Sequence, residues 1–297
     1  MITAQARGLT TQAPFPEQCG GAAEGESWVP GTLGPAAASA VTVRIRGVTS
    51  PGTGRAQHSA RQLLARQVVD RLGGRYSAEL GIDVDAGDAE VERWFLAATL
   101  FGTRIAASVA ERTFGVLSRA GLAEIGQARH IPTEDLIACL DEGGYTRYDF
   151  RTADRLQALS EVIGERYGGQ AAVIGETFTA YPELRQALDV LPGWGPVTIE
   201  LFLRELRGVW PGAQPPLDQR AAAAASHLGL LGPAQPDFPR IAQLATECHL
   251  DPRDLESGLV RLTLAHHRGW LHVLADPGAA SWRLPARRRR DEGTAPS

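Results

Sequence analysis

The chain has 297 residues, of which 43% are hydrophobic and 22% are charged, the balance of an ordinary globular protein. Its net charge is −4, so any contact with nucleic acid must use a local basic patch. No stretch approaches the roughly 18 apolar residues that span a bilayer, and the first residues lack the basic start and apolar core of a secretory signal. We therefore expect no membrane partner and a cytoplasmic location.

The cysteines and basic residues exclude several kinds of chemistry. Cys19, Cys139 and Cys248 are more than a hundred residues apart, so no pair has the spacing of a zinc ribbon or an iron–sulfur cluster. Cys248 with its neighbouring histidine, and the pair His266-His267, can in principle gather around a metal, but such helical residues are more often packed or solvated. We predict no cofactor. Every basic residue is arginine, so no lysine side chain can form a Schiff base.

Apolar residues recur at helical spacing along most of the chain. In the first such segment Leu64, Val68 and Leu72 form a single stripe. Two acidic residues follow Thr133, and this pattern predicts a helix start with Thr133 as its cap. Glycines and prolines separate the segments, and the alternation typical of strands is scarce, so the predicted fold class is all-α. The predicted helices cover residues 61–72, 91–100, 105–117, a stretch from 133, 152–167, 181–190, 197–206, 220–228, 238–247 and 251–267.

The two ends of the chain have a different composition. Residues 1–57 are rich in Gly, Ala, Pro, Ser and Thr without periodicity, and we predict a disordered extension, with a short extended piece at residues 41–45. Residues 276–297 contain four consecutive arginines, 287–290, in a tail that we also predict to be disordered. These arginines can touch phosphates or simply be solvated.

The most informative stretch is Leu-Pro-Gly-Trp-Gly-Pro at residues 191–196. One predicted helix runs into Leu191, and the next opens at Pro196, whose missing N–H suits the first helical position. Gly193 and Gly195 permit left-handed dihedral angles and close approach of the backbone. The N–H groups and dipole at the start of the second helix make an anion site, for which a DNA phosphate is the natural ligand.

With this hairpin the chain resembles the helix-hairpin-helix DNA glycosylases, and in particular their endonuclease III-like group. In that family a Leu-Pro-Gly-x-Gly hairpin is followed by a helix that carries a threonine, here Thr198. A loop rich in Gly and Pro comes next, here residues 209–217, and then a catalytic aspartate. Asp218 stands 23 residues after Gly195, at the start of an alanine-rich helix.

The resemblance covers about residues 60–230, and more weakly the chain to about 270. It implies two helical subdomains with a cleft between them, within a domain of residues 58–275. The first would be residues 91–207, ending in the hairpin. The second would combine residues 58–80 with 208–275. We expect a monomer.

The absence of lysine narrows the activity that the resemblance implies. Bifunctional members carry a lysine at the position of Val197. We therefore expect a monofunctional glycosylase that hydrolyses the N-glycosidic bond of a damaged or mispaired base flipped out of duplex DNA. Asp218 would stabilise the oxocarbenium-like state and orient water.

Two other interpretations stay open. Asp218 can be a plain helix cap, because a cap needs the same carboxylate. The alternative function is then a non-catalytic DNA-binding protein on the same scaffold. In the second interpretation, the chain has no nucleic-acid role and the hairpin glycines only turn the backbone.

The resemblance also places further residues at the DNA. Arginines flank the expected site and suit phosphate, although helical arginines often only solvate a face; they are Arg104, Arg204, Arg207 and Arg220. The residues expected to contact the strand are Pro192, Gly193, Trp194, Gly195, Val197, Thr198 and Arg220. Those expected in the base pocket, or as the wedge that fills the gap left by the base, are Phe101, Arg104, Tyr145 and Arg147.

The chain departs from many endonuclease III-like enzymes near its C-terminus. Those enzymes hold four cysteines there, whereas this chain has only Cys248. Hydrophobic packing of residues 238–270 against the helix at 61–72 would have to supply the support that a cluster gives.

Overall fold

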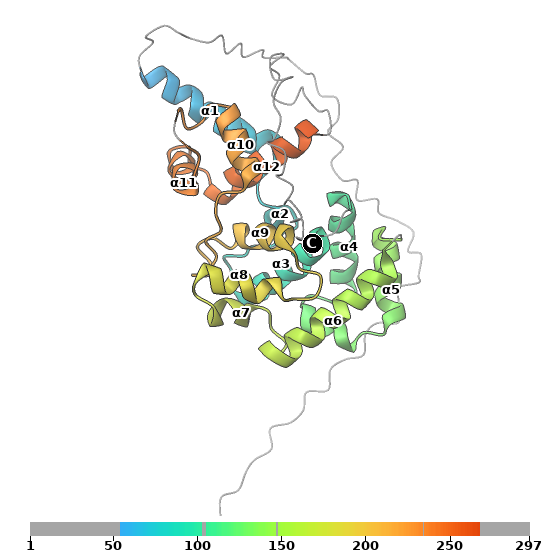
Figure 1. Cartoon of the computed structure of the whole chain (residues 1–297). Helices are drawn as coiled ribbons and strands as arrows, with labels where there is room; N and C mark the ends of the chain where they lie inside the picture. Colours follow the sequence, from blue (N-terminus) through green and yellow to red (C-terminus); the bar gives the residue numbers. More distant parts are fainter. Residues whose placement is uncertain (1–53, 103–104, 147, 234, 268–297) are drawn as a thin grey trace, which may run out of the picture. The chain divides into compact units, whose positions relative to one another are not determined.

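The computed structural model describes residues 54–267 except 103–104, 147 and 234 (Figure 1). Most of these residues are helical, and within them no strand forms; an isolated bridge joins Arg207 and Trp210. The all-α class is thereby confirmed. The predicted extended piece at residues 41–45, the predicted tail and Cys19 lie outside the described residues.

The described residues divide into two compact units, and each unit is described by itself. Unit one comprises residues 80–214, and unit two comprises residues 54–79 with 215–267. The helices of unit one are α3 (Asp88–Phe101), α4 (Ala107–Arg119), the 3-10 helix η1 (Ile125–His130), α5 (Thr133–Gly143), α6 (Asp149–Tyr167), α7 (Ala172–Thr177), α8 (Tyr181–Asp189) and α9 (Pro196–Glu205). The helices of unit two are α1 (Gly54–Leu72), α2 (Tyr76–Glu79), α10 (Gln219–His227), α11 (Phe238–Glu247) and α12 (Pro252–His267).

Each helix predicted from the sequence is present, with ends that mostly differ by a few residues. The largest difference is at α1, which begins at Gly54, so the prediction of disorder to residue 57 is wrong for residues 54–57. Thr133 is also not a cap as predicted. Pro132 occupies the cap position, and the Thr133 hydroxyl donates a hydrogen bond to Gln157 Oε1 at 3.1 Å.

The sequence did not predict the three shortest helices, α2, η1 and α7. Each spans too few turns to display a repeating apolar stripe, and each is instead fixed by polar contacts or caps. A capping box starts η1: the Glu124 side chain accepts the Gln127 N–H, and the Gln127 side chain accepts the Glu124 N–H. Arg261 of α12 holds α2 by lying 3.8 Å from the Tyr76 ring centroid and pairing with Glu79 at 2.8 Å.

Helix α3 is the central helix of unit one. Residues 94–100 are all buried, because this part of the helix is apolar around its whole circumference and the helix packs against α4, η1, α7 and α9. Glu92, which precedes this part, is a charged residue of the same helix. It is buried, and its Oε1 accepts the N–H of Ala172 at 2.7 Å, at the first residue of α7.

Helix α12 has the corresponding place in unit two, where it packs against α1, α10 and α11. The absence of an iron–sulfur cluster led us to expect that the C-terminal helices pack against the helix that contains residues 61–72. This packing is present. No helix of the described residues is long and apolar enough to cross a membrane.

Candidate nucleic-acid interface

The hairpin between α8 and α9 is a tight turn with a single left-handed residue. The N–H of Trp194 donates to the carbonyl of Leu191 at 3.1 Å. Gly193 has φ of 80°, the left-handed region that favours glycine. Gly195 has φ of −128° and ψ of 178°, which is extended backbone. Gly193 uses the left-handed freedom that glycine permits, whereas Gly195 does not use it.

Trp194 anchors the hairpin in the core of unit one. Its side chain is only 5% exposed, and its ring stacks on Phe95 with centroids 4.4 Å apart. Phe202 meets the indole edge-on at 5.1 Å, and the indole N–H donates to Thr99 Oγ1 at 3.2 Å. The prediction that this side chain contacts the DNA strand is therefore wrong, because its large apolar surface is stabilised by burial between α3 and α9.

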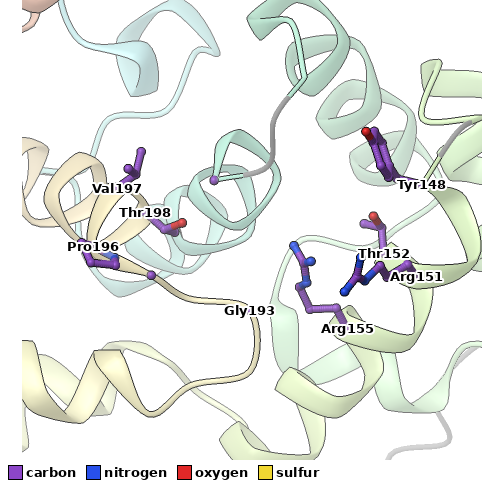
Figure 2. Close-up of a pocket in the computed structure, with 10 residues that line it drawn as sticks. Tyr148, Arg151, Thr152, Arg155, Gly193, Pro196, Val197 and Thr198 are labelled. Carbon is purple, nitrogen blue, oxygen red and sulfur yellow. The ribbon is translucent and has the colours of Figure 1, made fainter. Parts of the chain in front are cut away.

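A pocket of about 420 Å³ opens beside the hairpin in unit one (Figure 2). Tyr148, Arg151, Thr152 and Arg155 line it from one face of α6, because positions three and four apart share a side of a helix. The hairpin and the start of α9 contribute the opposite wall. The remaining lining residues are Gly102, Gly193, Gly195, Pro196, Val197 and Thr198. Two arginines thus line this pocket, and none of the lining residues is acidic.

Two glycines permit close packing at this pocket. A Cβ on Gly193 would collide with the Arg155 side chain, and a Cβ on Gly102 would collide with the Thr198 hydroxyl. Figure 2 shows Arg155 extending from α6 toward the hairpin. The hairpin glycine therefore both makes the turn and leaves room for a guanidinium.

The first turn of α9 adds a partial positive charge to the pocket. Gly195 is the N-cap and offers no side chain, and Pro196 occupies the first helical position. The first N–H groups of a helix lie beyond reach of its own carbonyls, and its dipole is positive at this end. Val197 is 48% exposed, whereas Thr198 is buried although it lines the pocket. Pro192 is half-buried in the turn before them.

The residues predicted for a base pocket or wedge do not gather in this structure. Tyr145 is buried and its hydroxyl donates to the carbonyl of Leu100 at 2.6 Å, so its expected contact with DNA is wrong and its role is packing. Phe101 is half-buried, with its ring centroid 6.5 Å from that of Trp94, and its role as a wedge stays a prediction. Arg104 and Arg147 lie outside the described residues.

Arg204 and Arg207, expected to face a phosphate or solvent, are both buried in unit one. The arginines at the pocket are Arg151 and Arg155, which the sequence reading did not single out. Periodicity carries no signal for them: Arg151 precedes the helix predicted from residue 152, and Arg155 is four residues from Leu159, on the side of the helix that the apolar stripe also uses.

Asp218 belongs to unit two, where it caps α10. Its Oδ1 accepts the N–H of Arg220 at 2.7 Å, and its own N–H donates to Glu256 Oε1 at 3.1 Å. Glu256 is buried, whereas Asp218 and Arg220 are half-buried. The Arg220 carbonyl accepts the hydroxyl of Thr263 at 2.9 Å. The cap predicted as one interpretation of Asp218 is present, and its catalytic role stays a prediction.

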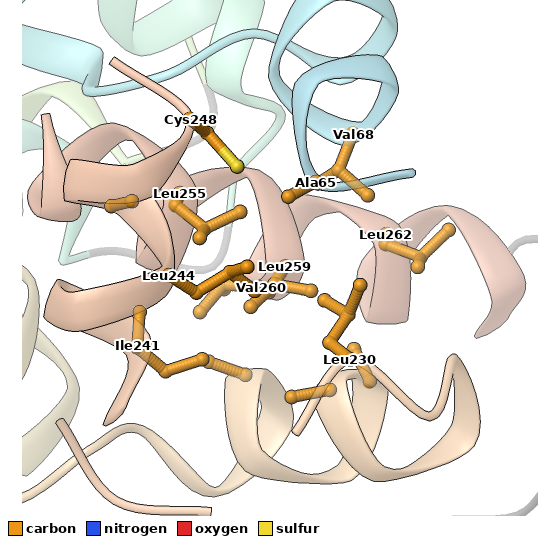
Figure 3. Close-up of a cluster of buried hydrophobic side chains, with 14 residues drawn as sticks. Ala65, Val68, Leu230, Ile241, Leu244, Cys248, Leu255, Leu259, Val260 and Leu262 are labelled. Atoms are coloured by element: carbon orange, nitrogen blue, oxygen red, sulfur yellow. The ribbon is translucent and has the colours of Figure 1, made fainter. Parts of the chain in front are cut away.

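A hydrophobic core supports the helix that begins after Asp218 (Figure 3). Alanines of α10 pack with Ile241 of α11, Leu259 of α12 and Val68 of α1 in one buried cluster. Cys248 belongs to the same core, and burial raises the pKa of its thiol, which keeps it protonated. Among the described residues, no three His, Cys, Asp or Glu side chains are placed to hold a metal ion.

Comparisons with models of protein families, with curated proteins and with solved structures gave no match. Function is therefore inferred from the residues and geometry of this chain alone.

Proposed function

We propose that the protein is a monofunctional DNA glycosylase, which hydrolyses the N-glycosidic bond of a damaged or mispaired base. The observation that supports this proposal best is the basic pocket at the hairpin. Arg151 and Arg155 line it together with the start of α9, and no lining residue is a carboxylate. A local positive patch of this kind is what a chain of net charge −4 needs in order to bind DNA.

A DNA phosphate suits this pocket for two physical reasons. The planar guanidinium of arginine pairs with two phosphate oxygens at once. The N–H groups and the dipole at the start of α9 favour a negative charge at the same place. Each phosphate that is neutralised releases counterions, so we expect binding to weaken steeply as salt is added.

Asp218 is the residue that we propose for the chemical step. Its carboxylate is held at the start of α10 by the N–H of Arg220, which fixes its orientation. As the base leaves with the electron pair of the N-glycosidic bond, positive charge develops on the deoxyribose, and a carboxylate stabilises that charge. A water molecule then bonds to C1′ and gives up its proton. The products are the free base and an abasic site.

The chain offers no lysine for a second step. Strand cleavage by a side-chain Schiff base is thus excluded, so we expect the abasic strand to stay intact until alkali is added.

A panel of end-labelled duplexes, each with a single lesion or mispair, tests this proposal. After incubation with the full chain and then with alkali, we expect a strand break at the lesion in at least one duplex. The break should be lost in Asp218→Asn, since asparagine caps a helix nearly as well but carries no charge.

Asp237→Asn is the matched control. Asp237 caps α11 by the same kind of bond, its Oδ1 accepting the N–H of Arg240 at 2.9 Å, in the same unit. This variant should cleave like the wild type. Equal cleavage by Asp218→Asn, or no cleavage of any duplex by the wild type, would exclude the enzymatic proposal.

A non-catalytic DNA-binding protein is the second candidate. It is favoured by the observation that the Asp218 carboxylate already has a structural task as the cap of α10. This candidate predicts salt-sensitive binding of duplex DNA with no product in the panel. Binding that ignores salt would exclude both candidates.

A further inference from the structure

The geometry points to an unpaired nucleotide as the occupant of the pocket beside the hairpin, with its phosphate at the arginines and its base against Tyr148. This inference rests on the proposed function only in placing nucleic acid at the hairpin. It adds that unit one holds a strand whose base is splayed out at this point.

The pocket has one polar part and one apolar part. Arg151 and Arg155 supply two guanidinium groups, four residues apart on the same face of α6. Tyr148 and Val197 supply apolar surface, and they are 36% and 48% exposed although both are large hydrophobic side chains. Exposed apolar surface next to a local positive charge is the combination with which proteins bind nucleotides.

The size of the pocket favours a single nucleotide over a duplex. Its volume of about 420 Å³ lies in the range of small-molecule sites. Bases paired in a duplex present only their edges in the grooves, so their faces cannot reach an aromatic ring. A base that has left the stack exposes its flat face and can stack on an aromatic side chain. Because every base has such a face, this stacking has no sequence preference.

Tyr148 is the residue that decides between this inference and simple attraction to phosphate. It is the N-cap residue of α6, where its side chain makes no capping hydrogen bond, so replacing it removes no side-chain cap. Phe150 is a matched control on the same helix. It is 67% exposed but does not line the pocket, because it is two positions from Tyr148 and points to another side.

The test is fluorescence anisotropy of the full chain with a labelled oligothymidine and, separately, with a duplex of the same length. Tyr148→Ala should weaken binding of the single strand by about five- to a hundredfold, the effect of one lost base stack. Tyr148→Phe keeps the aromatic ring and should recover most of the binding that Tyr148→Ala loses, whereas Phe150→Ala should bind like the wild type. Arg155→Gln should weaken both DNAs and reduce the slope of log K against log salt by about 1.

The outcomes separate this inference from the proposed function. Unchanged binding of the single strand by Tyr148→Ala, or equal losses in Tyr148→Ala and Phe150→Ala, would overturn the inference while the lesion panel decides the enzymatic proposal. Absence of any single-strand binding by the wild type would also overturn it. Loss of duplex cleavage in Asp218→Asn leaves it standing.

Discussion

Glu92 is a carboxyl group buried inside unit one, and its pKa is raised to about 7. Burial is the main cause, because it disfavours the charged form. The N–H of Ala172 lowers the pKa in part, while the charges of Glu124 and Asp88 raise it further. In the unfolded chain the same group titrates near 4.5. Between these two values the folded state holds a proton that the unfolded state has lost.

The stability of the protein should therefore fall as pH rises from about 4.5 to 7 and stay reduced above that window. The raised pKa corresponds to a penalty on the order of 3 kcal/mol at pH 8. Glu92→Gln should remove the penalty, so that the variant is more stable than the wild type at pH 8 and similar at pH 4.5. Urea unfolding at both pH values measures this.

Glu90→Gln is the control for Glu92. Glu90 lies on the same helix but pairs with Arg93 at 2.8 Å, and its loss should change stability by less than about 1 kcal/mol at either pH. If Glu92→Gln proved less stable than the wild type at pH 8, the ionised carboxylate of Glu92 would stabilise the folded state, contrary to this account.

The two hairpin glycines should respond differently to alanine. Gly193→Ala places a Cβ on a left-handed residue and against Arg155, which should cost at least about 1–2 kcal/mol and weaken DNA binding. Gly195→Ala meets extended backbone and no atom within 4 Å, so it should be tolerated. Denaturant unfolding and anisotropy with duplex DNA check both. Equal tolerance at the two positions would contradict the turn described here.

At the scale of elements, Trp194 anchors the hairpin by packing in the core of unit one. Trp194→Phe keeps an aromatic ring beside Phe95 but removes the hydrogen bond to Thr99, so we expect a loss of about 1–2 kcal/mol in stability. Affinity for duplex DNA should change less than twofold, because the side chain faces the core. A large loss of affinity with little loss of stability would restore the original prediction that this residue contacts the strand.

The sequence predicted the long helices well, and the physical reason is periodicity. A helix such as α6 repeats its apolar positions over several turns, and the pattern outweighs local exceptions. A turn has no period, so the sequence could not tell that Trp194 and Tyr145 point into the core. The pocket was missed for a related reason: Arg151 and Arg155 meet the hairpin only through tertiary packing across about 40 residues of chain.

At the scale of the whole molecule, unit two is held together by hydrophobic packing. Leu259 is fully buried in that packing, in the same core as the alanines of α10 and Val68 of α1. Leu259→Ala should lower the stability of this unit by about 2–5 kcal/mol. Hydrogen exchange would show the loss at the amides of α10 and α12. Unaltered protection there would mean that this core is not the support of α10.

Direct detection of the released base is the measurement that tests the central claim most closely. A duplex that gives alkali-dependent cleavage is incubated with the protein, and the supernatant is examined by mass spectrometry before any alkali is added. We predict free damaged or mispaired base with the wild type and with Asp237→Asn, and none with Asp218→Asn. Free base produced equally by Asp218→Asn, or an intact glycosidic bond with the wild type, would contradict the account.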